Sequence, residues 1–442
     1  MYMNDKTPRI RFKGFTDDWE QRKLSELATM HARIGWQNLR TSEFLDSGDY
    51  MLITGTDFED GKVNYSTCHY VEKERYEQDK NIQIKNGNIL ITKDGTLGKV
   101  AYVENLNMPA TLNAGVFNVE VKDKNETDGK YLFQFLKAPF LMDYVAQKAT
   151  GGTIKHLNQN ILVNFSISIP SKAEQIRIGE YFSNLDNLIT LHQRKYEKLV
   201  NVKKFMLEKM FPKNGEKSPE IRFSEFTDDW EQRKLSDAIV DIADGPFGSN
   251  LKIEHYTDEK EARIIQLSNL SDYGWQEPNT RYTTFEHAKE IRRCIVNEGE
   301  LVMGKMMPAG MTIIRPNTEK MYVLSSDCVR IKLDKNVAID KFFLYTTKSE
   351  AFLNQVNNDS QGSTRVRTSI SKIREMDFAT PSLEEQAKIG EYFTNLDNLI
   401  TLHQRDIFLL KDTIKWLVFT VKIRKKEFVL WFLTKNQSLK KL

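Results

Sequence analysis

The chain has 442 residues, of which 40% are hydrophobic and 28% are charged, so it has the composition of an ordinary globular protein of two to four domains. Its net charge of +3 disfavours a strong autonomous nucleic-acid binder, so any DNA contact must rely on local basic clusters or on partner proteins. Three scattered cysteines argue against a disulfide framework or a zinc site, and no apolar run is long enough to span a bilayer. The N-terminal residues lack the apolar run of a signal peptide, so we expect a cytoplasmic protein.

The first predicted elements are short strands. Runs of β-branched and aromatic residues alternate with Gly, Asp and Asn, which is typical of strands joined by tight turns. From about residue 128 to residue 148 the spacing of apolar residues becomes helical. The predicted strands of this first core lie at 50–54, 62–71, 88–92, 99–103 and 115–121. The first core is therefore predicted to be α/β. A second core follows a similar plan, with predicted strands at 263–267, 300–304, 311–315 and 327–333 and a predicted helix at about 339–356.

A long helix follows the first core. Apolar residues recur every seven positions in two rows, the coiled-coil-like period of helices packed nearly parallel or antiparallel. Ser171 is a natural N-cap, with Glu174 at the capping-box position. Ser382 and Glu385 have the same places before a second helix of this kind. From Ala173 to Met210 the helix would be roughly 55 Å long at ~1.5 Å per residue.

The same pattern then returns 211 residues later. Residues 15–25 (FTDDWEQRKLS) recur at 226–236, and residues 178–194 recur at 389–405 with one change. The stretches between these blocks are only weakly alike, but with one gap GNILITKDGTLGKV aligns with GELVMGKMMPAGMT. The alignment pairs Lys93 with Lys305. It predicts that the two cores share one α/β fold and differ in their side chains.

Four features together resemble the specificity subunit of type I restriction–modification enzymes. They are the duplicated frame, the P-x₃-EQ-x₂-I entry to each long helix, the DDWEQRKL lead-in and the segment DGPFGSNLK at 244–252. The resemblance implies that each core is a target recognition domain for one half of a split DNA sequence. It also implies a subunit without an active site, which directs two methyltransferase subunits and, in the full complex, two restriction/translocase subunits. S-adenosylmethionine, ATP and Mg would then be bound by those partners.

We therefore predict an α/β protein in which two target recognition domains are separated by two long antiparallel spacer helices, related by a pseudo-twofold internal repeat. The predicted order is a first recognition domain at 1–170, a spacer helix at 171–212, a linker at 213–220, a second recognition domain at 221–381, a second spacer helix at 382–422 and an atypical basic and apolar tail at 423–442. Independently of the resemblance, two recognition modules held apart by rigid helices of fixed length predict a bipartite DNA site, because half-site spacing follows protein geometry.

Two other functions remain open at this point. A bipartite protein-interaction scaffold without DNA binding would suit the low net charge. A self-contained nuclease–methyltransferase is disfavoured, because the sequence has neither a Pro-Pro pair for an adenine methyltransferase motif nor a G-x₄-G-K-[ST] phosphate loop. For the tail, a membrane-surface or partner-binding segment competes with an altered reading frame that has no evolved role.

The candidate DNA contacts are polar and basic residues on predicted loops. Lys and Thr on a Gly-rich strand connection can reach phosphates or base edges, although an ordinary solvated turn has the same composition. Basic residues also precede possible N-caps at Asn158 and Ser369, where Arg could instead grip guanine; a mobile loop without a ligand is the alternative. The candidates are Lys93, Thr96, Lys99, Thr153, Lys155, His156, Asn250, Lys252, Lys305, Thr364, Arg365 and Arg367.

Several other residues that could carry function are better explained by structure. Trp19 and Trp230, in the doubled lead-in, are predicted core anchors. His192 and His403 lie on the apolar helix stripe and are predicted to pack at a helix interface, with no other ligands nearby in sequence for a metal. Near Asn250, Phe247 is expected either to pack inward in a rigid turn or to lie beside a DNA contact.

Overall fold

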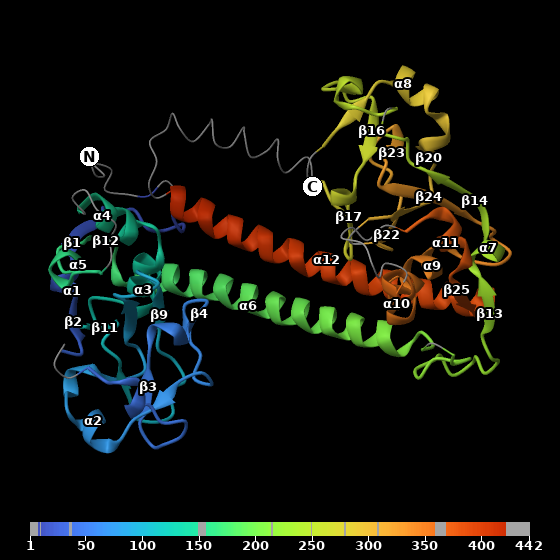
Figure 1. Cartoon of the computed structure of the whole chain (residues 1–442). Helices are drawn as coiled ribbons and strands as arrows, with labels where there is room; N and C mark the ends of the chain where they lie inside the picture. Colours follow the sequence, from blue (N-terminus) through green and yellow to red (C-terminus); the bar gives the residue numbers. More distant parts are fainter. Residues whose placement is uncertain are drawn as a thin grey trace. The chain divides into compact units, whose positions relative to one another are not determined.

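The computed structural model describes residue 8 and residues 10–34, 38–148, 156–213, 215–248, 250–277, 280–306, 309–358 and 368–420. The chain divides into two compact units (Figure 1). The first unit comprises residues 1–193 with 405–442, and the second comprises residues 194–404. Each unit contains one α/β core and part of each of the two long helices.

The first unit is built on two main sheets. The six-stranded sheet has the order β2-β11-β8-β9-β5-β4, and the four-stranded sheet has the order β6-β3-β10-β7, in which β10 is parallel to β3. A third sheet pairs β1 with β12. The strands are β1 (Glu20–Lys23), β2 (Ala28–Ala32), β3 (Met51–Ile53), β4 (Phe58–Glu59), β5 (Lys62–Val63), β6 (His69–Tyr70), β7 (Gln83–Ile84), β8 (Ile89–Thr92), β9 (Val100–Tyr102), β10 (Ala110–Leu112), β11 (Val116–Val121) and β12 (Ser166–Ile169).

Strand β8 explains why the sequence shows a continuous apolar run rather than an alternating one. Ile89 and Ile91 enter one hydrophobic cluster, and Leu90 enters another on the opposite face. Successive side chains of a strand point to opposite faces, so a strand with a core on each side must be apolar throughout. In the second unit Leu301 and Met303 enter one cluster, while Val302 enters another.

Short helices complete the first core. They are α1 (Leu24–Leu27), α2 (Lys73–Glu77), α3 (Gly129–Lys137), α4 (Phe140–Lys148) and α5 (Gln159–Leu162). The helical pattern predicted from about residue 128 to residue 148 is confirmed, and it is divided into two helices, α3 and α4. The break includes Pro139, which lacks the backbone N–H that a continuous helix would need.

The second unit repeats this plan with different side chains. Its sheets have the orders β14-β24-β21-β22, β15-β19-β16-β23-β20, β13-β25 and β17-β18, and β16 pairs in parallel with β23 as β3 does with β10. The strands are β13 (Glu231–Lys234), β14 (Ile239–Asp244), β15 (Tyr256–Thr257), β16 (Ala262–Ile265), β17 (Leu270–Ser271), β18 (Gly274–Trp275), β19 (Tyr282–Thr283), β20 (Ile295–Val296), β21 (Leu301–Gly304), β22 (Thr312–Ile314), β23 (Met321–Leu324), β24 (Cys328–Leu333) and β25 (Asp377–Thr380).

The short helices of the second unit match those of the first. They are α7 (Leu235–Ala238), α8 (Phe285–Glu290), α9 (Asp340–Thr346), α10 (Glu350–Asn358) and α11 (Ile370–Glu375). The helix expected at about 339–356 is again two helices, α9 and α10. The predicted pairing of the two cores gains support from Gly98 and Gly310, which both have positive φ and lie against the helix that follows the core, at Met142 and at Val356.

Two long helices are the longest elements, and their ends are 211 residues apart. Helix α6 spans Lys172–Lys209 and α12 spans Leu383–Thr420, each with 38 residues, as the heptad pattern predicts. In the second unit Leu199 and Met206 of α6 pack against the cluster that contains Phe393 and Leu396 of α12. The α/β fold class with paired spacer helices is therefore confirmed. Within the residues that the structure describes, no helix is both long and apolar enough to cross a membrane.

Candidate nucleic-acid interface

Each α/β core is attached to a long helix by hydrogen bonds to a buried carboxylate. Glu174, fully buried, accepts hydrogen bonds from Arg11 Nε at 2.7 Å, Arg11 Nη2 at 2.8 Å and Trp19 Nε1 at 3.2 Å. The equivalent Glu385 accepts two bonds of 2.7 Å from Arg222. These bonds to the carboxylate raise the pKa of both arginines. A bidentate pair with so little exposure fixes the start of each helix against its lead-in segment.

This arrangement corrects one expectation and confirms two. The carboxylates of Glu174 and Glu385 do not close a capping box; they bind arginines 163 residues away. Ser382 does cap α12, because its hydroxyl accepts from the backbone N–H of Glu385 at 3.3 Å. Trp19 and Trp230 are both buried, as predicted for core anchors.

The next residue of each long helix holds the start of a core helix, α3 in the first unit and α9 in the second. Gln175 accepts from the backbone N–H of Asp128 at 2.8 Å and donates to the carbonyls of Glu126 and Pro170. Gln386 makes the same three bonds to Ile339, Val337 and Pro381. One helical turn on, both helices approach the core too closely for a side chain. A Cβ on Gly179 would lie 2.8 Å from the backbone nitrogen of Tyr131, and one on Gly390 would lie 3.1 Å from that of Phe342.

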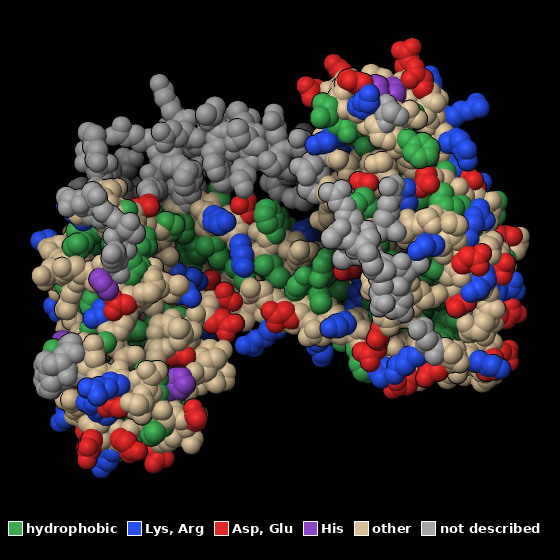
Figure 2. Space-filling view, viewed as in Figure 1, with side chains coloured by type: hydrophobic (Ala, Val, Ile, Leu, Met, Phe, Trp, Pro, Cys, Tyr) green, Lys and Arg blue, Asp and Glu red, His purple; other side chains and the backbone are tan. Residues whose placement is uncertain are grey.

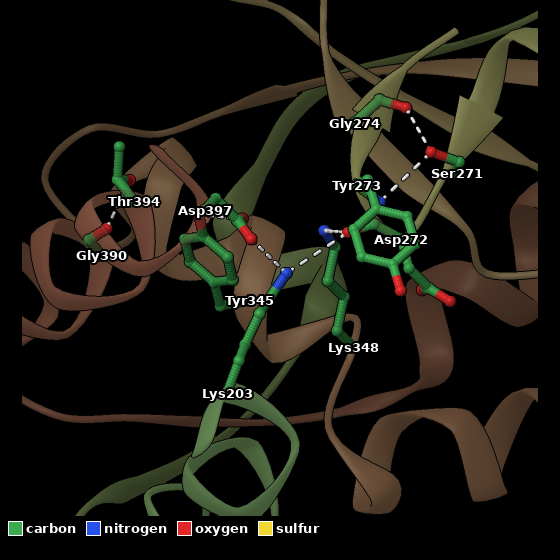
Figure 3. Close-up of polar contacts among 10 residues, drawn as sticks. All are labelled: Lys203, Ser271, Asp272, Tyr273, Gly274, Tyr345, Lys348, Gly390, Thr394 and Asp397. Atoms are coloured by element: carbon green, nitrogen blue, oxygen red, sulfur yellow. Dashed lines mark hydrogen bonds and ion pairs between the residues drawn. The ribbon is translucent and has the colours of Figure 1, made fainter. Parts of the chain in front are cut away.

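A second polar joint lies further along each long helix. In the first unit Asp186 accepts from Gln134 at 2.8 Å and from Lys137 at 2.7 Å. In the second unit Tyr345 replaces Gln134 and donates to Asp397 at 2.8 Å, and Lys203 of α6 takes the other oxygen at 2.5 Å (Figure 3).

Lys348, the equivalent of Lys137, is thereby displaced from the carboxylate. It donates to the carbonyl of Asp272, in the β17–β18 hairpin, at 2.8 Å. Burial, and then the nearby charge of Lys203, lowers the pKa of Lys348 to about 8.

In the first core the structure brings two of the predicted contact segments together. The loop 93–99 joins β8 to β9, and Thr96 and Lys99 on it are exposed. Lys93 is half-buried, with its ammonium 5.5 Å from the centre of the Phe117 ring. His156, from the second segment, is largely exposed and pairs with Asp94 of the loop. The backbone N–H of Leu157 also donates to the carbonyl of Lys93 at 2.9 Å.

The second core has the same backbone contact but a different electrostatic arrangement. Thr368 donates to the carbonyl of Lys305 at 3.0 Å, as Leu157 does to Lys93. Lys305, however, is only 4% exposed, and its ammonium pairs with Asp244 at the end of β14. To reach a phosphate, this ammonium would have to give up that partner.

Asn250 and Lys252 lie near α8. The carbonyl of Asn250 accepts from His287 Nε2 at 2.9 Å, and Lys252 is exposed, with its ammonium 3.6 Å from Glu254. Phe247, on the same turn, does not pack inward; it is 82% exposed, as is Ile253. Neither Phe247 nor Ile253 is among the predicted contacts, although the glycines on either side of Phe247, at 245 and 248, are a signal of a projecting turn.

The two predicted N-caps are confirmed, since the side chain of Asn158 accepts from Asn160 and that of Ser369 from Lys372. Helices α5 and α11 that they open are short, so any anion bound there must be held by side chains. The predicted contacts Thr153, Lys155, Thr364, Arg365 and Arg367 lie outside the described residues, as does the tail at 423–442. In the view of Figure 2, basic and acidic side chains are interspersed on the surface of each unit.

His192 is half-buried on the long helix, as predicted for an interface histidine. Its Nδ1 atom lies 3.6 Å from a carboxylate oxygen of Asp406.

Comparison with known proteins agrees with this architecture. The family model described as "Type I restriction modification DNA specificity domain" matches residues 16–201 and again residues 227–411. The MjaVIII specificity subunit of a type I restriction enzyme from Methanocaldococcus jannaschii is 24% identical over 430 residues, which cover 92% of this chain and 97% of that protein. The putative MjaX specificity subunit from the same organism is 24% identical over 447 residues, which cover 96% of this chain and 98% of that protein.

Among solved structures, the S subunit of a type I restriction–modification system from M. genitalium has the same fold. It aligns with a TM-score of 0.58 at 15% identity, covering 95% of this chain and all of that one. With one family domain in each half and full-length relatives of the same kind, this chain belongs to the specificity subunits of type I restriction–modification enzymes and carries two target recognition domains.

Proposed function

We propose that each recognition domain of this non-catalytic subunit reads one half of a bipartite DNA target and that the pair directs adenine methylation or cleavage by partner subunits. The observation that carries the proposal is that the same attachment to the long helices is repeated in two domains whose candidate contact surfaces differ. Arg11–Glu174 and Arg222–Glu385 fasten the two cores in the same way, while Lys93 and Lys305, at equivalent backbone positions, have different surroundings. One attachment with two different reading surfaces is what a target with two different half-sites requires.

In the first recognition domain, proposed to span residues 1–170, the reading surface is the β8–β9 loop with the segment around His156. Thr96 and Lys99 are exposed on the loop, and the Asp94–His156 pair joins it to a segment that continues toward Thr153 and Lys155. Lys and Thr side chains at such a junction suit phosphate contacts, which position the protein, while neighbouring groups read base edges.

In the second recognition domain, proposed to span residues 221–381, we assign contact to the Phe247–Lys252 turn and to the basic segment at Thr364, Arg365 and Arg367. Lys252 would meet phosphate. The exposed ring of Phe247 would pack on a thymine methyl or wedge at a base step. Lys305 is better suited to hold Asp244 and orient the end of β14 than to bind phosphate.

Repeated exposed leucines support two copies of one partner. Leu188 and Leu191 on α6 are 43% and 47% exposed, and their equivalents Leu399 and Leu402 on α12 are 44% and 40% exposed. Apolar side chains at matching places on a solvent-facing helix suit a protein contact. We propose that a methyltransferase subunit docks on each set and that two restriction/translocase subunits complete the complex. S-adenosylmethionine, ATP and Mg would be bound by these partners in the cytoplasm.

The test is to exchange the first core. Residues 28–150 are replaced by the corresponding core of another specificity subunit, and methylated adenines are mapped in cells that also express the methyltransferase partner. We expect one half-site to change while the other half-site and the gap between them stay the same. A change in both half-sites would contradict independent readers, and methylation unaffected by the exchange would favour a scaffold without DNA binding.

A further inference from the structure

The first unit has an apolar groove between its core and the two long helices. The groove has a volume of about 450 Å³, and its walls are almost entirely apolar. Trp19, Tyr131 and Phe182 form one side, with Ile178 beside them. Ile414 and Val418, from the last turns of α12, form the other side. Its few polar wall residues include Lys137, which is already paired with Asp186.

In the second unit, the place equivalent to this groove is filled by an aromatic side chain. The equivalents of Trp19, Tyr131 and Phe182 are Trp230, Phe342 and Phe393, each 211 residues later. The ring of Phe211 lies among them, with centroid distances of 6.2 Å to Trp230, 5.8 Å to Phe342 and 5.9 Å to Phe393. Met210 and Phe211 are 2% and 5% exposed, so the residues directly after α6 fill the space among these three aromatic rings.

The repeat fails at the residues that would do the same for the first unit. In the sequence, Val421 and Lys422 are the equivalents of Met210 and Phe211, so a lysine replaces the aromatic residue of the first copy. The surrounding wall is the same in kind, because all three of these positions hold an aromatic residue in both units. No described side chain fills the groove of the first unit. An aromatic-lined cavity of this size exposes apolar surface, and burial of one aromatic ring in the cavity would remove that surface from water, which is favourable.

We propose that the groove of the first unit is closed by the chain's own C-terminal segment, residues 421–442, through one of its aromatic side chains. The segment follows directly from Val418, which lines the groove, and contains Phe428, Trp431 and Phe432. Phe428 comes ten positions after Val418, and an extended chain spans up to ~3.3–3.6 Å per residue, so the ring can return to the groove after a turn. The tail then has the role in the first unit that Met210 and Phe211 have in the second. This inference is independent of the proposed DNA contacts.

The first experiment locates the tail by photocrosslinking in the full-length chain. A benzoylphenylalanine is placed at Lys415, an exposed groove residue of α12, and in a matched control at Lys204, the equivalent exposed residue of α6. We expect crosslinks from position 415 to residues 421–442 of the same molecule and none from position 204 to those residues. Mixing isotopically heavy and light chains separates the outcomes: crosslinks between chains would show a second copy as the occupant, and no crosslink to the tail would also overturn the proposal.

The second experiment restores the repeat. A chain that ends at residue 422 should bind several-fold more of the apolar dye 8-anilinonaphthalene-1-sulfonate than the full chain and should show faster hydrogen exchange in α3. In the same shortened chain, Val421→Met with Lys422→Phe should reverse both effects. If the shortened chain binds no more dye than the full chain, the tail does not cover the groove and the proposal fails. A shortened chain that fails to fold would still leave the crosslinking result to decide.

Discussion

The two buried tryptophans offer a matched pair of substitutions. Trp19 donates its indole N–H to the buried carboxylate of Glu174 at 3.2 Å. No described group accepts from the indole N–H of Trp230, although it is buried in the equivalent place. Replacing either residue by Phe removes a similar part of a ring in a similar edge-on aromatic contact, to Tyr131 or to Phe342. Trp230 also makes an edge-on contact with the ring of Phe211, which has no described counterpart beside Trp19, so Trp230→Phe loses slightly more packing. The hydrogen bond of Trp19 and the unsatisfied donor of Trp230 act in the opposite direction and have the larger effect.

The expected difference is large enough to measure. A hydrogen bond to a charged group contributes about 1.5–3 kcal/mol, and a buried polar group without a partner costs about 1–3 kcal/mol. Trp19→Phe should therefore be more destabilising than Trp230→Phe by at least about 2 kcal/mol, because the first loses a bond and the second loses an unsatisfied donor. For a unit of this size that corresponds to a difference of at least about 4 °C in the melting temperature.

The assay combines thermal unfolding with hydrogen exchange. Exchange in β12 and in β25 reports the opening of the first and of the second unit separately, so each substitution is compared with the wild type in its own unit. We expect faster exchange in β12 for Trp19→Phe and little change in β25 for Trp230→Phe. Equal destabilisation of the two units, or a larger effect of Trp230→Phe, would show that the bond from Trp19 to Glu174 contributes nothing and would refute the reasoning.

Three further substitutions test other parts of the structure. Lys99→Ala should weaken DNA binding to all sequences and lower the log–log salt slope by ~1, measured by fluorescence anisotropy at several salt concentrations; an unchanged slope would remove Lys99 as a phosphate contact. Phe247→Ala should reduce methylation at only one of the two half-sites, measured by methylation mapping. An equal loss of methylation at both half-sites would contradict the assignment of Phe247 to the second domain. Because burial lowers the pKa of Lys348 to about 8 while the unfolded chain keeps the proton up to about pH 10.5, the free energy of unfolding should rise with pH across this window by up to about 3 kcal/mol relative to Lys348→Met. The matched Lys137→Met variant is the control, and a wild-type curve parallel to that of Lys348→Met from pH 8 to 10.5 would show that Lys348 keeps its proton when folded.

The periodic elements could be predicted from the sequence to within a residue. The heptad rows predicted a helix from Ala173 to Met210, and α6 spans Lys172–Lys209, because a long apolar stripe has only one regular structure that buries it. The apolar run at 88–92 likewise predicted β8. Both successes rest on local spacing, which the sequence shows directly.

The contacts made by single charged residues could not be predicted in this way. Glu174 satisfied a local capping pattern, yet its partner Arg11 is 163 residues away, and the local pattern holds no information on that distance. A signal was present in the repeat, because Ile-Arg-Phe occurs at 10–12 and again at 221–223. Lys305 aligned with Lys93, but its burial depends on Asp244, which comes from a different strand.

The close approach of Gly179 and Gly390 to the backbone of α3 and α9 has an evolutionary consequence. At these points the nearest atoms of the core helix include a main-chain nitrogen and the Cβ atom of Lys130 or Lys341, which every residue except glycine possesses. The fit therefore depends on the path of the incoming helix more than on its sequence. A foreign core that begins its helix with the same backbone geometry could be inherited by recombination without any compensating change in the long helix. Acquiring a new specificity in such a lineage would then require a single exchange of DNA, and a bulky residue at either glycine would block that route.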